Sequence, residues 1–298
     1  MLDDKSISAN GMADLVPRIE LALETASRWG ADCPEKLASA MRYALLAPGK
    51  RLRPAMVLMA CEAVGGEMDR GLIGAVAVEM VHAYSLVHDD LPAMDDDDLR
   101  RGRQTTHIAF DEATAILAGD ALLATSFEQL ANIALSPQVA LQCLRTLARA
   151  AGPECLVGGQ AEDLAAEKDG EQTLRRLEAI HRRKTGALFD ASIRIGGLIG
   201  GGNSSALLAL QRYSQPLGLA FQVVDDCLDH TATAETLGKR TGKDQARGKL
   251  TYPGLLGLEE ARKKATDLVA ESLSAVAVFG NAAWRLRWLA RFVLDRTR

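Results

Sequence analysis

The most constraining stretch of this sequence is 79–107, where an apolar run with helical spacing ends in six aspartates within ten residues, followed by three arginines. Like charges held this close repel one another, so the cluster is costly unless cations lie among its members. Oxygen ligands without His or Cys suit a hard ion such as Mg²⁺, which takes one or two carboxylates and completes its shell with water and phosphate oxygens. Taken alone, the stretch fits a solvated acidic loop equally well.

A second acidic cluster at 221–229 favours the metal interpretation, because it repeats the same arrangement. Its polar side chains are Gln222, Asp225, Asp226 and Asp229. Their i, i+3, i+4, i+7 spacing puts them on one face of a helix. The first cluster has similar phasing, since His82 precedes Asp89 by seven residues. Two such helices could face each other across a cavity and hold several Mg²⁺ ions and one diphosphate.

The two clusters resemble the aspartate-rich motifs of the trans-isoprenyl diphosphate synthases and, within that family, those of the bacterial farnesyl diphosphate synthases (geranyltranstransferases). Asp89-Asp90, four residues and Asp95 resemble the first motif with a two-residue insertion, and 225–229 resembles the second. The resemblance extends from about Gly49 to Pro253. It implies a set of aspartates that bind three Mg²⁺ ions per active site when substrate is present. These are Asp89, Asp90, Asp95, Asp96, Asp225, Asp226 and Asp229.

The segment 49–54 places three cations in four positions where a helix is expected to start. Guanidinium groups bind phosphate oxygens in pairs, and a helix N-terminus adds exposed N–H groups. On its own this could be an ordinary surface patch, and His82 an ordinary half-buried histidine. The resemblance implies that Arg100 contacts the allylic diphosphate, and that a further set holds the diphosphate of isopentenyl diphosphate without metal. That set is Gly49, Lys50, Arg53, His82 and Arg101.

Further along the chain, the resemblance implies that Lys184, Lys239 and Lys249 neutralise the departing diphosphate, and that Thr185 and Gln222 flank the reacting carbons. The implied catalytic set is Lys184, Thr185, Gln222, Lys239 and Arg100. Glycines in 237–249 would allow that loop to close over the substrate like a lid. The same loop is not a nucleotide phosphate loop, because the GxxxxGK[ST] spacing fails.

The expected reaction is the head-to-tail condensation of isopentenyl diphosphate with dimethylallyl or geranyl diphosphate to give farnesyl diphosphate (C15). Tyr84 lies five residues before Asp89, roughly 7–8 Å along the helix axis, so its ring could be the floor of the cavity. The C15 prediction rests on this position and on the resemblance. Tyr84 could instead be an ordinary core aromatic, and the smaller Ser85 leaves a C20 product open.

Other functions remain as alternatives to a farnesyl diphosphate synthase. They are a geranylgeranyl diphosphate synthase, a class I terpene cyclase and a non-catalytic subunit of a heteromeric synthase. A cyclase would not need the 50/53/82 cations, and a silent subunit would be expected to lack some ligands. Two departures from the family pattern bear on substrate range: Gln104 in place of Pro, and Glu162 in place of an apolar residue.

Composition favours helices packed on helices, since 48% of the 298 residues are hydrophobic but only 4% are aromatic. We expect one all-α domain over 1–298, a single-domain helical bundle of the isoprenoid synthase type with a central active-site cavity and frayed residues at 1–12. No strand is expected. The expected helices are 15–29, 36–46, 54–64, 70–91, 109–118, 120–133, 137–151, 154–166, 171–198, 203–230, 254–275 and 281–296.

Charge and targeting signals restrict the surroundings of the protein. The net charge of −4 offers no basic surface for nucleic acid. The five cysteines are scattered, without CxxC pairs, which predicts free thiols and neither a disulfide framework nor a zinc site. We see no signal peptide and no uninterrupted apolar run of membrane-spanning length, so a cytoplasmic protein is expected. The resemblance implies a homodimer.

Overall fold

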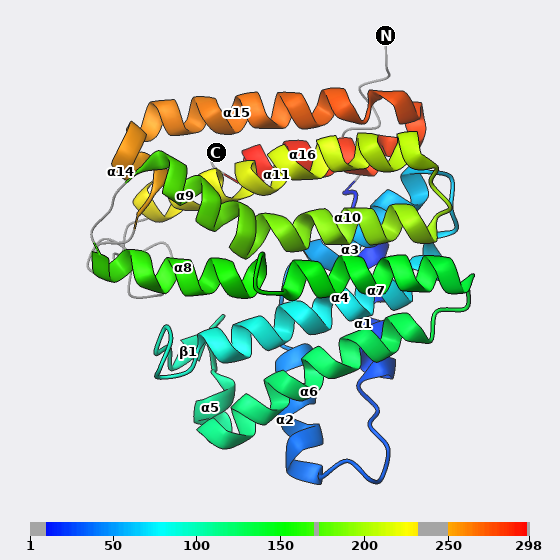
Figure 1. Cartoon of the computed structure of the whole chain (residues 1–298), viewed down its shortest axis with the longest axis vertical. Helices are drawn as coiled ribbons and strands as arrows, with labels where there is room; N and C mark the ends of the chain where they lie inside the picture. The colour runs from blue at the N-terminus through cyan, green and yellow to red at the C-terminus, as the bar shows by residue number, and fades with distance from the viewer. Residues whose placement is uncertain (1–9, 170–172, 232–249, 297–298) are drawn as a thin grey trace.

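The computed structural model describes residues 10–169, 173–231 and 250–296, which form a bundle of stacked helices with one short strand pair (Figure 1). The prediction of an all-α fold is confirmed. In chain order the elements are α1 (Leu15–Ala26), α2 (Glu35–Leu45), α3 (Leu52–Ala63), α4 (Met68–Asp89), β1 (Leu99–Arg100), β2 (Arg103–Gln104), α5 (Thr106–Ala109), α6 (Glu112–Ala131), α7 (Pro137–Ala151), α8 (Leu156–Asp169), α9 (Leu174–His181), η2 (Arg182–Gly186), α10 (Ala187–Ile199), α11 (Ser204–Thr231), α14 (Tyr252–Leu256), α15 (Leu258–Ala275), η3 (Ala277–Ala283) and α16 (Trp284–Asp295).

Helices α3, α4 and α10 form the core of the bundle. Nearly all residues of α3 and α10 are buried. The two helices come so close that a Cβ on Gly196 would lie 2.0 Å from the carbonyl oxygen of Val57. Helix α4 is long and apolar enough to cross a membrane by length and composition, but 72% of its most apolar window is buried in the bundle. A helix that is apolar all round is also what a buried core position requires.

Several helix ends differ by a few residues from the sequence-based expectation, the short elements α5 and η3 were not expected, and three helix breaks were placed wrongly. Helix α6 continues through Gly119, where a break was expected; the glycine instead gives room to His88, whose Nε2 would lie 2.2 Å from a Cβ there. The helix expected over 171–198 is interrupted by the π-helical turn η2. The helix expected over 254–275 is divided at Gly257, whose φ is 80°. Hydrophobic spacing does not report such backbone features.

The strand pair is a second difference, because no strand was expected. It is an antiparallel hairpin that pairs Leu99 with Gln104 and Arg100 with Arg103. Both loop residues have positive φ, 53° at Arg101 and 76° at Gly102. This is the type I′ pattern, whose twist matches that of the flanking strands. The hairpin thereby holds a cluster of arginines beside the C-terminal end of α4.

The two ends of the described chain are fastened to the bundle. Gly11 and Met12, which were expected to be frayed, are buried. Arg285 of α16 donates to the carbonyl oxygen of Gly11 at 2.7 Å and to both carboxylate oxygens of Asp14 at 2.9 and 2.8 Å. It also forms an ion pair with Glu62 of α3 at 3.1 Å. All five cysteines are free, as expected.

Candidate active site

The first acidic cluster, residues 89–98, lies at the C-terminal end of α4. The chain folds back on this end. The backbone N–H of Asp95 donates to the carbonyl oxygen of Asp89 at 2.8 Å, and the backbone N–H of Asp97 donates to the carbonyl oxygen of Asp90 at 3.2 Å. Burial, together with the charges of Asp95 and Asp90, raises the pKa of Asp89 to about 6 despite the nearby Lys184. The raised pKa indicates that carboxylates here are short of compensating positive charge.

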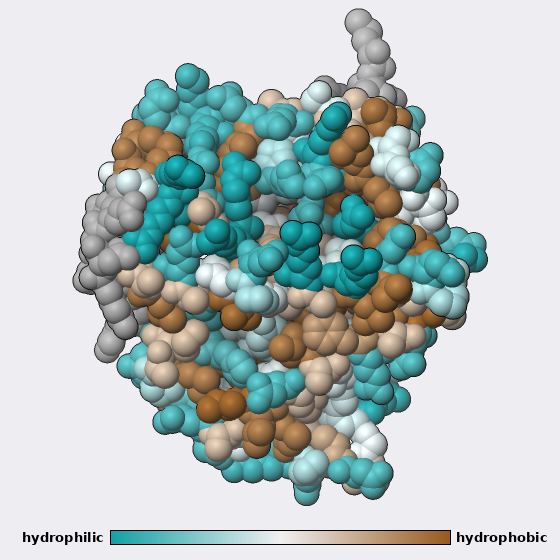
Figure 2. Space-filling view, in the orientation of Figure 1, coloured by the Kyte–Doolittle hydropathy of each residue, from teal (hydrophilic) through white to brown (hydrophobic). Residues whose placement is uncertain are grey.

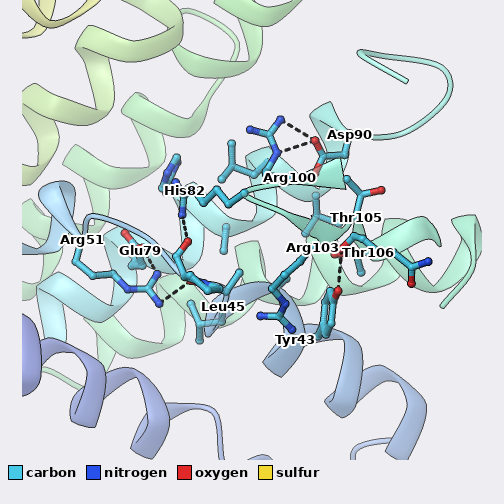
Figure 3. Close-up of a pocket in the computed structure, with 18 residues that line it drawn as sticks. Tyr43, Leu45, Arg51, Glu79, His82, Asp90, Arg100, Arg103, Thr105 and Thr106 are labelled. Carbon is cyan, nitrogen blue, oxygen red and sulfur yellow. Dashed lines mark hydrogen bonds and ion pairs between the residues drawn. The ribbon is translucent and has the colours of Figure 1, made fainter. Parts of the chain in front are cut away.

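Asp90 is paired directly with Arg100 of the hairpin. The guanidinium Nη2 and Nε lie 2.6 and 2.7 Å from Asp90 Oδ1, and the carboxylate is buried (Figure 3). Separate roles were predicted for these two residues, metal binding for Asp90 and contact with the allylic diphosphate for Arg100. The structure brings them together. In the described state Arg100 is therefore the cation that balances Asp90.

The second acidic cluster, residues 225–229, lies near the C-terminal end of α11. Burial and the charge of Asp229 raise the pKa of Asp225, although Arg296 opposes this rise. Gln222, predicted to share this face, donates from Nε2 to Asp225 Oδ2 at 3.3 Å. Asp226 accepts a hydrogen bond from the backbone N–H of Tyr252 at 2.9 Å. This bond ties the cluster to the start of α14.

A group of basic side chains, here called the cationic cluster, lies beside the aspartates. Its members are Lys50, Arg53, His82, Arg101 and Arg296. Burial and the neighbouring Arg53 and Arg101 hold the pKa of His82 well below its ordinary value. Burial, Arg296 and Arg101 lower the pKa of Lys50. The lowered pKa keeps His82 neutral at pH 7. Positive charges that lower the pKa of neighbouring basic groups, as at Lys50 and Arg53, form a site where a bound anion is strongly favoured.

Arg53 is a half-buried member of the cationic cluster. Burial lowers its pKa to about 10, and the charge of Arg101 contributes. Its Nη1 lies 3.2 Å from His82 Nε2 and its guanidinium carbon is 5.2 Å from the centre of the Phe189 ring. Its buried Nε has no hydrogen-bond partner among the described residues. A buried guanidinium N–H without an acceptor is rare in proteins. An anion in the cavity would supply that acceptor.

Arg101 and Gly49 act as a unit. Arg101 Nη1 donates to the carbonyl oxygen of Pro48 at 2.5 Å. A Cβ at Gly49 would lie 2.4 Å from the same Nη1, so only glycine allows the guanidinium to approach the backbone here. Arg51, Asp96 and Arg101 are the non-glycine residues with positive φ in the described chain. Backbone strain of this kind tends to occur at functional sites.

Lys184 and Thr185 lie in the π-helical turn η2, a feature that is frequent at functional sites. Lys184 Nζ lies 2.6 Å from Asp163 Oδ2, and Thr185 is buried. The departure at Glu162 is balanced, since this carboxylate forms an ion pair with Arg183. At the departure Gln104, the backbone carbonyl oxygen accepts from the Tyr43 hydroxyl at 2.8 Å, a bond that proline would accept equally well. Lys239 and Lys249 lie outside the described residues.

Tyr84 is buried on α4, beside His88. Its ring meets the His88 ring edge-on at 5.7 Å, and His88 Nε2 lies 3.0 Å from the carbonyl oxygen of Ile116. Within the described part of the chain the Tyr84 hydroxyl has no hydrogen-bond partner, and burial with the nearby Asp89 raises its pKa to about 12. Ser85 is also buried, and its hydroxyl donates to the carbonyl oxygen of His82 at 2.9 Å.

Sequence reasoning missed several residues of this region. Arg296 Nη2 lies 2.7 Å from Asp225 Oδ1, and its guanidinium carbon lies 4.6 Å from the centre of the Phe221 ring. Asp163, the partner of Lys184, was missed as well. The only signal for Arg296 was a basic residue at the end of an amphipathic C-terminal helix, which does not report where that helix ends. The charge pattern around 159–163 could have suggested Asp163.

A pocket opens between α2, α4 and the hairpin, next to the cationic cluster (Figure 3). It encloses about 570 Å³, including the space at its mouth. Four predicted site residues line it: His82, Asp90, Arg100 and Arg101. The pocket also has walls from α2 and from the strand β2 that no prediction assigned.

Comparison with known proteins places this geometry in a family. A model described as polyprenyl synthetase matches residues 34–279. A dimethylallyltranstransferase of Fischerella ambigua is 45% identical over 282 residues, covering 94% of this chain and 81% of the relative. A chloroplastic geranylgeranyl pyrophosphate synthase of Capsicum annuum is 46% identical over 250 residues, covering 83% and 68%.

Solved structures of isoprenyl diphosphate synthases resemble this fold. An FPP/GFPP synthase from Zymomonas mobilis matches with a TM-score of 0.86 and 39% identity, covering 95% of this chain and 97% of that chain. A geranylgeranyl pyrophosphate synthetase from Pyrococcus horikoshii matches with a TM-score of 0.87 and 32% identity, covering 95% and 97%. The chain therefore belongs to the polyprenyl synthetase family, as its resemblance to the trans-isoprenyl diphosphate synthases predicted, and is a prenyltransferase of isoprenoid biosynthesis.

Proposed function

We propose that this prenyltransferase condenses isopentenyl diphosphate with dimethylallyl or geranyl diphosphate and releases farnesyl diphosphate. The observation that carries the proposal is the adjacency of the acidic and cationic clusters. Arg296 pairs with Asp225 and lies near enough to Lys50 to lower its pKa. Carboxylates suit a diphosphate that arrives with metal ions, and the cationic cluster suits one that binds without them. Two unlike diphosphate sites side by side are what a two-substrate condensation needs.

The donor set of the acidic clusters fits Mg²⁺, since it offers carboxylate oxygens alone. Within 10–169, 173–231 and 250–296, no three His, Cys, Asp or Glu side chains form a ready-made metal cage. An incomplete cage is consistent with an ion that takes part of its shell from substrate phosphates. Prenyl synthases of this family are generally metal-dependent. We propose that three Mg²⁺ ions share Asp89, Asp90, Asp95, Asp96, Asp225, Asp226 and Asp229, acting when bound as Lewis acids on the leaving diphosphate.

The remaining residues act on the substrates themselves. In the proposed reaction the allylic C–O bond breaks, the isopentenyl double bond attacks the allylic cation, and a proton leaves C2 of the adduct to the released diphosphate. Lys184 and Arg100 supply fixed positive charge where negative charge develops, with Lys239 and Lys249 assigned the same role by resemblance. Thr185 and Gln222 flank the reacting carbons. Arg53, His82, Lys50, Arg101 and Gly49 hold the isopentenyl diphosphate.

The position of Tyr84 supports a C15 product. Tyr84 is 4% exposed, and its ring meets edge-on the ring of His88, one turn further along α4, which is itself bonded to the Ile116 carbonyl oxygen of α6. The Tyr84 ring cannot rotate without disturbing His88, and the proposal takes this fixed ring as the floor that stops a longer tail. A C20 product is the second candidate, because the Capsicum annuum and Pyrococcus horikoshii relatives are named geranylgeranyl synthases and Ser85 offers more room.

We further propose that the protein acts as a cytoplasmic homodimer. Large apolar side chains on α6 and α7 are exposed, with 44% of Ile116, 57% of Leu117 and 55% of Leu141 accessible to solvent. Figure 2 shows apolar patches among polar side chains on the face over these two helices. Exposed apolar groups of this kind commonly mark protein–protein contacts. Light scattering after size-exclusion chromatography would test the dimer, which a monomer at micromolar concentration would contradict.

The function is tested by incubating the purified protein with Mg²⁺, labelled isopentenyl diphosphate and either dimethylallyl or geranyl diphosphate, and resolving the products by length. A dominant C15 product is expected. Tyr84→Ala should then lengthen the product, whereas Leu208→Ala, which truncates an exposed side chain of α11, should not. A dominant C20 product from the unaltered protein would refute the role of Tyr84 and leave the condensation intact. No incorporation with either primer would refute the proposed reaction.

A further inference from the structure

The short helix α14 lies where three longer elements of the bundle meet. It contacts α9, α11 and α15, and Figure 1 shows it at the end of the bundle where α9 and the last turns of α11 lie. Its first residue, Tyr252, is fully buried. The N-cap Thr251 accepts from the backbone N–H of Gly254 at 3.3 Å, and Pro253 favours a helical first turn. The segment 251–254 thereby fixes where Tyr252 lies.

The backbone of Tyr252 contacts the second acidic cluster. Its N–H donates to Asp226 Oδ2 at 2.9 Å. An N–H at the start of a helix has no partner within that helix, so this donor is available to a carboxylate from another element. The bond restricts the rotation of the Asp226 carboxylate, one of the proposed metal ligands. Hydrogen bonds of this kind orient metal-binding carboxylates in proteins.

The ring of Tyr252 contacts a different part of the site. The centre of its ring lies 5.6 Å from that of His181, the last residue of α9, and the π-helical turn η2 follows directly. On the side of α15, Lys264 Nζ lies 5.9 Å from the centre of the Tyr252 ring. Lys264 also forms an ion pair with Glu178 of α9 at 2.7 Å. The ring is therefore enclosed by groups of α9 and α15.

The hydroxyl of Tyr252 does not account for this position. Within the described part of the chain it has no hydrogen-bond partner. Burial, together with Glu178 and Asp226, raises the pKa of Tyr252 well above its ordinary value, so the hydroxyl is neutral at pH 7. What the residue contributes to its neighbours is an aromatic ring and a backbone N–H.

We propose that Tyr252 is a positioning residue, which holds the second acidic cluster in register with η2. The inference rests on the proposed function, in which Asp226 and Lys184 act on the same departing diphosphate. Tyr252 touches both the carboxylate and the chain directly before the turn that carries Lys184, so it links their positions. Because a misplacement of about 1 Å can lower a catalysed rate about 100-fold, this link affects more than packing.

The role is tested by the binding of Mn²⁺ to the full-length protein with inorganic diphosphate, measured from the electron paramagnetic resonance of the free ion. Mn²⁺ suits the same oxygen ligands as Mg²⁺. Tyr252→Leu removes the ring and should weaken this binding by about tenfold or more, as the loss of groups that orient metal ligands does. Tyr252→Phe keeps the ring and should bind Mn²⁺ as the unaltered protein does.

Two matched controls separate positioning from packing. Tyr213 is as fully buried as Tyr252, but it lies roughly 20 Å along α11 from Asp226. Tyr213→Leu should lower stability, since its hydroxyl donates to the Leu286 carbonyl oxygen at 2.7 Å, and leave Mn²⁺ binding unchanged. Lys264→Met is a milder variant, which should weaken Mn²⁺ binding by a smaller factor than Tyr252→Leu does. Its control is Lys263→Met, which removes the exposed neighbouring lysine and should change nothing.

Steady-state kinetics add a second measurement. Tyr252→Leu should lower kcat and leave the KM for isopentenyl diphosphate unchanged, because the cationic cluster binds that substrate without metal. Mn²⁺ binding that is unchanged in Tyr252→Leu, or weakened equally by Tyr213→Leu, would overturn the positioning role. If Tyr252→Leu does not fold, unchanged binding in Lys264→Met overturns it.

The two proposals fail in different ways. Tyr252-dependent Mn²⁺ binding in a protein that condenses no substrate would refute the proposed function and leave the positioning role standing. Condensation in a protein whose Mn²⁺ binding does not depend on Tyr252 would refute the positioning role alone.

Discussion

The buried ion pair between Arg51 and Glu79 offers the sharpest test of the energetics beneath the site. Arg51 Nη1 lies 2.7 Å from Glu79 Oε1, and the two side chains are 3% and 6% exposed. Arg51 also contacts Glu20 at 2.7 Å and the Ala47 carbonyl oxygen at 2.9 Å. Burial alone would lower the pKa of Arg51, but the two carboxylates raise it above its ordinary value. The arginine is thus held charged in the interior.

Removing one partner should cost far more than removing both. Arg51→Leu leaves Glu79 buried, and Arg51 is its one ion-pair partner among the described residues, so we expect a loss of about 3–5 kcal/mol in unfolding free energy. Glu79→Leu should cost less, because Arg51 keeps Glu20 and the Ala47 carbonyl. In the double variant most of the loss should be recovered. Leucine and arginine both carry a Cβ, so the positive φ of 48° at position 51 adds nothing to the comparison.

The assay is urea unfolding followed by tryptophan fluorescence and far-UV circular dichroism, at one fixed protein concentration because an oligomer's stability depends on it. The four proteins form a double-mutant cycle, and the coupling free energy should be about 2–3 kcal/mol. Glu20→Leu is the exposed control, since this carboxylate is 41% exposed, and should cost at most about 1 kcal/mol. A coupling below about 0.5 kcal/mol would refute the reasoning.

Three further predictions follow from single contacts. Gly196→Ala should lower the unfolding free energy by about 1–3 kcal/mol or more, because the new Cβ would lie 2.0 Å from a backbone oxygen. Gly30→Ala is the control, because a Cβ there would meet no atom within 4 Å. Urea unfolding of the two variants measures the difference. Burial raises the pKa of Cys143 to about 12, so this thiol stays protonated at pH 8 and should resist a thiol reagent until urea unfolds the chain. Arg296→Met should raise the KM for isopentenyl diphosphate by about tenfold in steady-state assays, because one charged donor of the cationic cluster is lost.

The sequence predicted the helical architecture because its signal is local. Apolar residues at helical spacing mark each helix, so α7 was placed at its observed bounds. The misplaced boundaries have non-local causes. Gly119 was taken for a break because glycine disfavours helices, whereas its role is to admit the His88 ring from α4. The hairpin was missed because two-residue strands carry no alternation, although Arg-Gly flanked by charged residues could have indicated its turn.

The residues of the candidate site were predicted from the sequence, but the ion pairs between them were not. From the motif spacing, the 89–98 and 225–229 aspartates and the 50–53 cations were predicted to lie at one end of the bundle. The spacing could not foresee that Asp90 pairs with Arg100, or that Asp225 pairs with an arginine from the last helix. Such pairings depend on where distant elements pack, which no local pattern encodes. The pocket beneath the hairpin escaped prediction for the same reason.

These ion pairs show that charged side chains of the site already have partners of opposite charge before substrate binds. Asp90 is paired with Arg100 and Asp225 with Arg296, at 2.6 and 2.7 Å. When metal ions and the substrate diphosphates bind, these partners can be exchanged: each aspartate gains an ion and each arginine gains a phosphate oxygen. The exchange replaces one charge pair by another, so binding avoids the desolvation cost of an unpaired charge. Arg53 differs, because its buried Nε has no acceptor in the described state. Its position therefore favours the substrate that brings an anion and no metal, which sets the two diphosphate sites apart.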